Sequence, residues 1–171
     1  MADKRIRQYI GIIAAVLAYY LIHEGAHLIT ALCMGVFKEV KFLGLGMQVD
    51  VAAAQMTDLQ MGIFCLAGAV CTLFAAVLLT LLAPHICRIE NKIVKAAFYY
   101  VTITMLLLDP LYLSVLCGFF GGGDMNGIRL LLPEVVARIV FGVLFIVGLV
   151  VFIKRILPLY KAAFSENNAV Q

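Results

Sequence analysis

Four long apolar runs divide this sequence, and short polar segments separate them. A helix that spans a membrane needs about 20 mostly apolar residues. Runs of that length cover residues 9–34, 62–82, 94–118 and 135–153. The third run is interrupted by Asp109-Pro110, where Asp109 could cap a helical segment that restarts at the proline. The pattern predicts an all-α polytopic membrane protein with about four transmembrane helices.

Residues 36–51, between the first two runs, follow a different pattern. They are rich in β-branched and aromatic residues and are punctuated by Gly44 and Gly46. This pattern predicts a short strand, a glycine turn and a return strand. An open hairpin cannot face lipid, because its unpaired backbone groups would find no partners there. We therefore expect a membrane-associated β-hairpin that lies at the interface or is buried against the helices.

Composition supports a membrane location. Of the 171 residues, 64% are hydrophobic and 13% are charged, whereas soluble domains are about half apolar and a quarter charged. With no repeat or linker, we expect one membrane-embedded domain over residues 1–171. The net charge of +3 comes from basic residues at the edges of apolar runs, which excludes nucleic acid as a partner and leaves the lipid bilayer.

The distribution of basic residues orients the predicted helices. If the N-terminus is cytoplasmic, nine Lys and Arg residues lie on the cytoplasmic side and four on the other side. The nine are Lys4, Arg5, Arg7, Arg88, Lys92, Lys95, Lys154, Arg155 and Lys161. Basic residues are enriched in cytoplasmic loops. We expect a multi-pass protein of a prokaryotic plasma membrane with both termini in the cytoplasm.

The first apolar run contains the sequence His23-Glu24-Gly25-Ala26-His27, which is an H-E-x-x-H motif. Residues four apart lie on one face of a helix, so both imidazoles can reach one metal ion. Zinc binds imidazole nitrogen and lowers the pKa of a bound water to about 7. Glu24 can take the proton of that water and pass it to a leaving amine. Ionisable groups are costly inside a membrane, which favours a functional role for all three.

Two histidines leave zinc short of one protein ligand. Asp124 follows three glycines in the loop that emerges on the same side as the motif, and the glycines would let the chain fold back. Asp109, within the third run, is the alternative ligand. His85 falls in the short loop after the second run, on the opposite side, and we expect no role for it. The sequence therefore predicts one Zn²⁺ held by His23, His27 and Asp124.

The H-E-x-x-H motif in a first apolar helix, a hairpin after it and a later Asp-x-x-Gly together resemble the site-2 protease family of intramembrane zinc proteases. The resemblance spans about residues 9–132. It implies that His23 and His27 are metal ligands and that Glu24 is the general base. The family's aspartate ligand stands in a Leu-Asp-Gly context, whereas here Asp124 is followed by Met and Asn before Gly127. Family members cleave transmembrane segments of other membrane proteins.

We therefore expect a zinc metalloendopeptidase whose substrate is a transmembrane protein or peptide. An exposed hairpin edge could pair with an unwound substrate strand, and proline at Val40 and Phe42 would test that role. Two alternatives stay open: a protease-like protein that binds transmembrane helices without cutting them, and a zinc hydrolase acting on lipid or a small amide. The sequence leaves the substrate and the oligomeric state open.

Overall fold

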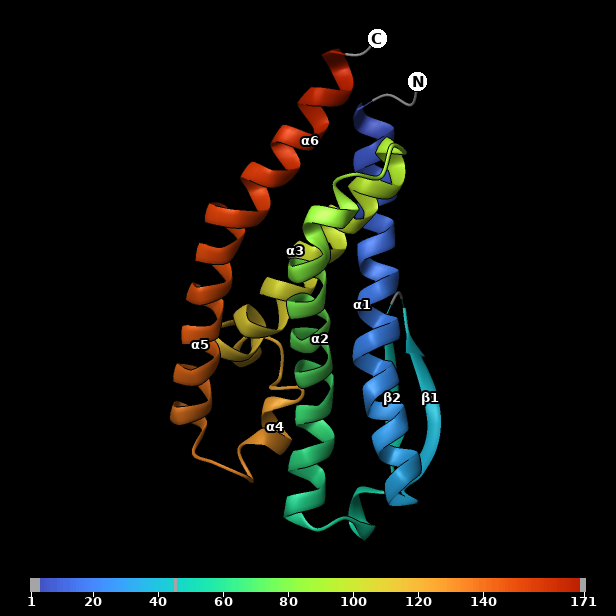
Figure 1. The fold of residues 1–171 in the computed structure, drawn as a ribbon. Coiled ribbons are helices and arrows are strands. Elements are labelled where there is room, and N and C mark those ends of the chain that lie inside the picture. The colour runs from blue at the N-terminus through green and yellow to red at the C-terminus, as the bar shows by residue number, and fades with distance from the viewer. Residues whose placement is uncertain (1–3, 45, 170–171) are drawn as a thin grey trace.

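The computed structural model describes residues 4–44 and 46–169, and this part contains four helices long and apolar enough to cross a membrane. The first three are α1 (Lys4–Met34), α2 (Asp58–Ile86) and α3 (Lys92–Ser114). The fourth is composite: α5 (Glu134–Val151), a π-helical turn (Phe152–Ile156) and α6 (Leu157–Ala169). The chain is therefore a multi-pass membrane protein, and the predicted fold class is confirmed (Figure 1).

The predicted hairpin is present between α1 and α2. Strands β1 (Phe37–Leu43) and β2 (Gly46–Val51) pair antiparallel, with Val40 opposite Val49 and Phe42 opposite Met47. Gly35, with a φ of +69°, turns the chain sharply at the end of α1. The hairpin therefore runs back alongside the second half of α1 rather than extending away from the bundle (Figure 1).

Local capping sets where α2 and α3 begin. The Thr57 hydroxyl accepts a hydrogen bond from the Gln60 amide, and the Gln60 side chain accepts one from the Thr57 amide, which forms a capping box. The Asn91 side chain accepts from the Ile93 and Val94 amides at the start of α3. Both helices consequently begin a few residues before the apolar runs that predicted them.

The predicted interruption at Asp109-Pro110 is wrong, because α3 continues through both residues. Proline removes one amide donor, which leaves the carbonyl of Leu106 without its usual partner. Helices in a membrane tolerate such a gap when a neighbouring helix packs against it. Gly148 of α5 packs here, so closely that a methyl group on it would lie 3.0 Å from the Leu106 oxygen.

The third helix ends at Ser114, four residues earlier than predicted. A 3₁₀ turn (Leu116–Gly118), a glycine loop and the four-residue α4 (Met125–Ile128) follow it. The second helix is longer than predicted, because Pro84 does not end it. His85 is therefore in the last turn of α2 and not in a loop.

The largest buried cluster joins the hairpin to α2, α3, α4 and α5. It includes Val36, Val49, Val51, Phe64, Cys65, Leu113, Cys117, Met125, Ile128 and Phe141. These side chains lie on the half of the bundle that holds the hairpin and α4. The start of α1, the α2–α3 connection and α6 lie at the other end (Figure 1). The fold thus fixes the hairpin and the loop before α4 on one common core.

Candidate metal centre

His23 and His27 project from α1 toward α2 and α4, and both are buried. Their exposed fractions are 6% and 3%, and their Nε2 atoms are 3.2 Å apart. The four-residue spacing places the two rings on one helix face, as predicted. His23 precedes the end of α1 by eleven residues, or about 16 Å of helix. The pair therefore lies well inside the membrane-spanning length.

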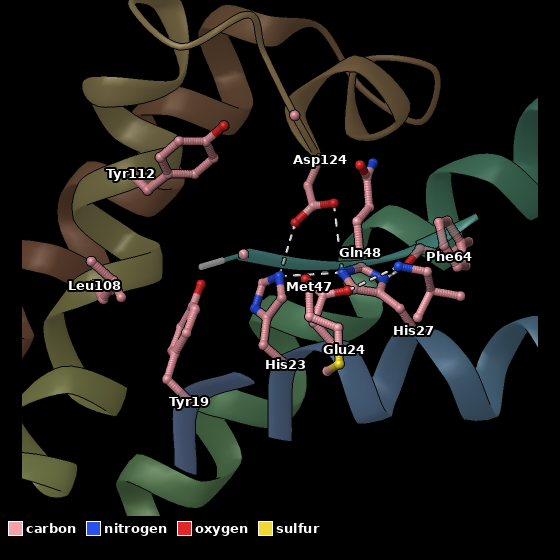
Figure 2. Close-up of a pocket in the computed structure, with 13 residues that line it drawn as sticks. Tyr19, His23, Glu24, His27, Met47, Gln48, Phe64, Leu108, Tyr112 and Asp124 are labelled. Atoms are coloured by element: carbon pink, nitrogen blue, oxygen red, sulfur yellow. Dashed lines mark hydrogen bonds and ion pairs between the residues drawn. The ribbon is translucent and has the colours of Figure 1, made fainter. Parts of the chain in front are cut away.

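Asp124 meets the two histidines from the other side. Its Oδ2 is 3.1 Å from Nε2 of His23, and its Oδ1 is 3.6 Å from Nε2 of His27 (Figure 2). Gly121, Gly122 and Gly123 have φ values of +80°, +89° and +47°. Such conformations favour glycine, and they fold the chain back so that Asp124 points at α1. One ligand atom from each of His23, His27 and Asp124 lies within 4.8 Å of the others.

The other ring nitrogens are held by hydrogen-bond acceptors. Nδ1 of His27 is 2.8 Å from the carbonyl oxygen of Phe64, and Nδ1 of His23 is 3.2 Å from Oδ2 of Asp109. A carbonyl or carboxylate oxygen can only accept, so each neutral ring carries its proton on Nδ1. Both Nε2 lone pairs then face each other and the Asp124 carboxylate. Three acceptors at this separation need a shared proton or a cation, and this donor set fits zinc.

The charge state of Asp124 suits a metal ligand. Burial alone raises the pKa of its carboxyl, but His23 and His27, which in their protonated forms would donate to it from Nε2, outweigh burial and lower the pKa to about 2. Asp124 is therefore ionised at neutral pH, and its side chain is 22% exposed. A partly exposed carboxylate beside two buried imidazoles leaves one side of the site open to the cavity described below.

Asp109 lies behind His23 and not among the three converging ligand atoms. It is 1% exposed and contacts Nδ1 of His23, the ring nitrogen that faces away from Asp124. The hydroxyl of Tyr19 donates to Asp109 Oδ1 at 2.5 Å, and the hydroxyl of Thr72 donates to Oδ2. Three donors hold Asp109 in a position where it can orient the His23 ring. A metal-bound histidine usually has such a carboxylate or carbonyl beside its second ring nitrogen.

Gly68 of α2 lets the histidines approach this helix. A methyl group at that position would lie 2.6 Å from Nε2 of His27 and 2.7 Å from Nε2 of His23. Real carbon neighbours do not come so close. Only glycine therefore fits at position 68 while the two rings stay where they are.

A cavity of about 380 Å³ opens beside the cluster (Figure 2). Glu24 lines it, and its Oε2 accepts a hydrogen bond of 3.3 Å from the Val49 amide of β2. The rest of the lining comprises Tyr19, His23, His27, Gly46, Met47, Gln48, Val49, Phe64, Leu108, Tyr112, Gly123 and Asp124. The cavity therefore lies between β2 on one side and α3 on the other, with Glu24 and the cluster at its floor.

The strand edge at the cavity belongs to β2. The Val49 amide points toward Glu24 and away from β1. Backbone groups alternate direction along an antiparallel strand, so the Met47 amide also points toward the cavity. Val40 and Phe42, which the sequence offered as the substrate-pairing edge, lie on β1 opposite these residues. Their amides face away from the cavity.

Several residues of the site were not predicted. Tyr19 stands four residues before His23, so the same spacing that paired the histidines places it on their face. Asp109 was weighed as a ligand and instead contacts the far side of His23. The contributions of Thr72 and the Phe64 carbonyl have no sequence signal, since each depends on how α2 packs on α1. His85, at the far end of α2 from Phe64, takes no part in the cluster.

Comparisons with protein-family models, with curated proteins and with solved structures found no match to this chain. Its function must therefore be argued from the geometry of the site.

Proposed function

We propose that the protein is an intramembrane zinc metalloprotease that hydrolyses peptide bonds within or near transmembrane segments of other membrane proteins. The observation that carries the proposal is the convergence of two imidazole Nε2 atoms and one carboxylate on a cavity that Glu24 also lines. His23, His27 and Asp124 would hold the ion. Bound there, zinc would supply Lewis-acid activation of water and of the scissile carbonyl.

Glu24 has the position of the general base. Its carboxylate lies at the floor of the cavity, and the Val49 amide holds Oε2 in place. Glu24 would take one proton from the attacking water and give it to the nitrogen of the leaving amine. Peptide and water then yield one carboxylic acid and one amine. Asp109, through Nδ1 of His23, would keep that ring aimed at the ion.

The β2 edge supports a peptide as the substrate rather than a lipid. By strand alternation the Met47 backbone is placed toward the cavity, where an extended chain would find a main-chain partner, while the Val49 amide already donates to Glu24. Such strand addition binds main chain and needs little side-chain specificity. The cavity also includes apolar Leu108 and Phe64, which suit the side chains of a transmembrane segment.

The experiment is a pair of measurements on detergent-purified protein. We expect about one zinc per chain in wild type and in Glu24→Gln, and a loss of zinc in Asp124→Ala. Against a panel of fluorogenic transmembrane peptides, Glu24→Gln should abolish cleavage. Glu39→Gln, which alters an exposed glutamate on β1, is the matched control and should cleave normally. A folded wild-type chain that binds no zinc, even when zinc is supplied, would overturn the proposal.

We further propose a location in the plasma membrane of a prokaryote, with both termini in the cytoplasm. Nine basic residues, against four on the other side, support this orientation. The proposed metal site would then be nearer the non-cytoplasmic face. Protease protection of N- and C-terminal epitope tags in sealed vesicles tests the orientation, and cleavage of both tags only after the vesicles are opened is expected for right-side-out vesicles.

A further inference from the structure

A second cavity, of about 560 Å³, is lined by residues of α1, α3 and α6. The start of α1 and α6 lie at the end of the bundle away from the hairpin and α4 (Figure 1). Lys4 and Arg7 of α1 and Lys161 of α6 line it, together with Tyr99, Tyr100 and Tyr160. None of these residues belongs to the metal centre or its cavity. The proposed protease activity therefore leaves this basic, aromatic cavity unexplained.

The charge of this cavity is unbalanced. Three cations line it, and no Asp or Glu is among the described residues that do so. The ion pairs of Lys41 and Arg138 lie elsewhere, in the hairpin and at the start of α5. Lys95 adds a buried positive charge behind the wall: it is 1% exposed, and its Nζ lies 5.6 Å from the ring centre of Phe164, which lines the cavity.

The Lys95 ammonium donates to the carbonyl oxygen of Ala163 at 3.1 Å. No carboxylate contacts it among the residues whose side chains the structure describes, which end at Ser165. A buried ammonium is costly unless it is compensated. An anion in the adjoining cavity would compensate Lys95 and the three lining cations together, so charge complementarity selects a negatively charged occupant.

The level of the cavity in the membrane favours a lipid as the occupant. Residues 134–153 form about 30 Å of helix, which matches the hydrocarbon thickness of a bilayer. Lys154 and Arg155 follow at once, and the cavity-lining Leu157, Tyr160 and Lys161 come next. This is the headgroup level, where tyrosines are also enriched. Basic pockets between helices at this level bind anionic headgroups.

We propose that this cavity is a binding site for a glycerophospholipid with an anionic headgroup. The phosphate would contact the ammonium and guanidinium groups of Lys4, Arg7 and Lys161. The acyl chains would leave toward lipid past the apolar walls formed by Leu157 and Phe164. Such a lipid would tie the start of α1 to α6, two elements that share few direct contacts.

The test uses delipidated protein in detergent, with lipid binding followed by native mass spectrometry. Phosphatidylglycerol should bind to wild type, and phosphatidylcholine should bind at least about 10-fold more weakly. The triple variant Lys4→Gln, Arg7→Gln, Lys161→Gln should lose about 10-fold or more of the phosphatidylglycerol affinity. The charge-retaining triple Lys4→Arg, Arg7→Lys, Lys161→Arg should keep it.

The control removes three charges at the same end without touching the cavity: Arg88→Gln, Lys154→Gln, Arg155→Gln. An equal loss of affinity in both triples would overturn the proposal and leave only a general attraction of the basic end for anionic lipid. Inorganic phosphate alone is the second probe. If it binds as tightly as phosphatidylglycerol and with the same dependence on the three residues, the site takes a soluble phosphate and the lipid proposal fails. Zinc content, measured on the same samples, reports on the metal centre separately.

Discussion

Substituting Gly68 by alanine tests whether the histidine cluster needs the shape that α2 gives it. The new methyl carbon would lie 2.6 Å from Nε2 of His27 and 2.7 Å from Nε2 of His23. Ordinary contact begins at 3.4 Å, so the rings must retreat by about 0.8 and 0.7 Å. Metal ligands tolerate displacements of only about 0.2 Å. The substitution therefore displaces the two proposed ligand atoms by more than a metal site tolerates.

The size of the effect follows from that displacement. Changes beside metal ligands cost about 10- to 100-fold in metal affinity, and a misplacement near 1 Å can cost about 100-fold in activity. We expect zinc affinity to fall by about 100-fold. Overpacking costs about 1–3 kcal/mol, while alanine is about 1 kcal/mol better than glycine in a helix. The variant should therefore remain folded.

The assay is competition for zinc with a chromogenic chelator, together with a thermal melt followed by circular dichroism. Gly142→Ala is the matched control, because its methyl group would meet only Ser114, at an ordinary 3.7 Å. That variant should bind zinc like wild type. A folded Gly68→Ala protein with wild-type zinc affinity would refute the reasoning, since the two Nε2 atoms could not then both be ligands in this arrangement.

Three further predictions address neighbouring residues. Asp109→Asn removes the negative charge behind His23 and should lower zinc affinity by about 10- to 100-fold; wild-type affinity in the same chelator assay would show that Asp109 does not orient the ring. Met47→Pro removes an amide that faces the cavity and should abolish peptide cleavage while zinc stays bound, whereas Phe42→Pro, directly opposite on β1, should not; equal activity in both would exclude pairing at β2. The hydrogen bond and charge of Lys41 lower the pKa of Asp50, so this pair stabilises the hairpin above the ordinary carboxyl pKa and the contribution is lost as pH falls through the lowered value. Lys41→Gln should raise the pKa of Asp50 toward its ordinary value in a ¹³C carboxyl titration, and an unchanged midpoint would show that the pair does not form.

Much of the fold could be predicted because a membrane restricts what a chain may do. Apolar runs of about 20 residues predict spanning helices. The β-branched and aromatic residues on either side of a glycine turn predicted the hairpin. The prediction failed at Asp109-Pro110, where packing of Gly148 against the freed carbonyl lets the helix continue. Rules for isolated helices do not include such a neighbour.

Some residues of the candidate site could be predicted from the sequence, and others could not. His23, Glu24 and His27 were predicted from spacing within one helix, and Asp124 from its glycine loop and its side of the membrane. These are local signals. The places of Asp109, Thr72 and the β2 edge depend on contacts between segments 25 to 90 residues apart. No local pattern encodes which of two paired strands faces inward.

The position of the hairpin also has a consequence for the bilayer around the protein. Because Gly35 folds the hairpin back along α1, exposed Lys38, Glu39 and Lys41 stand beside the second half of that helix. Hydrocarbon covers such charges only at a cost, so we expect the membrane on this flank to be thinner than on the flank formed by α5, where the exposed surface is apolar. Transmembrane segments with short apolar lengths would be best matched to the thin flank, and membrane thickness itself would then influence which neighbours reach β2.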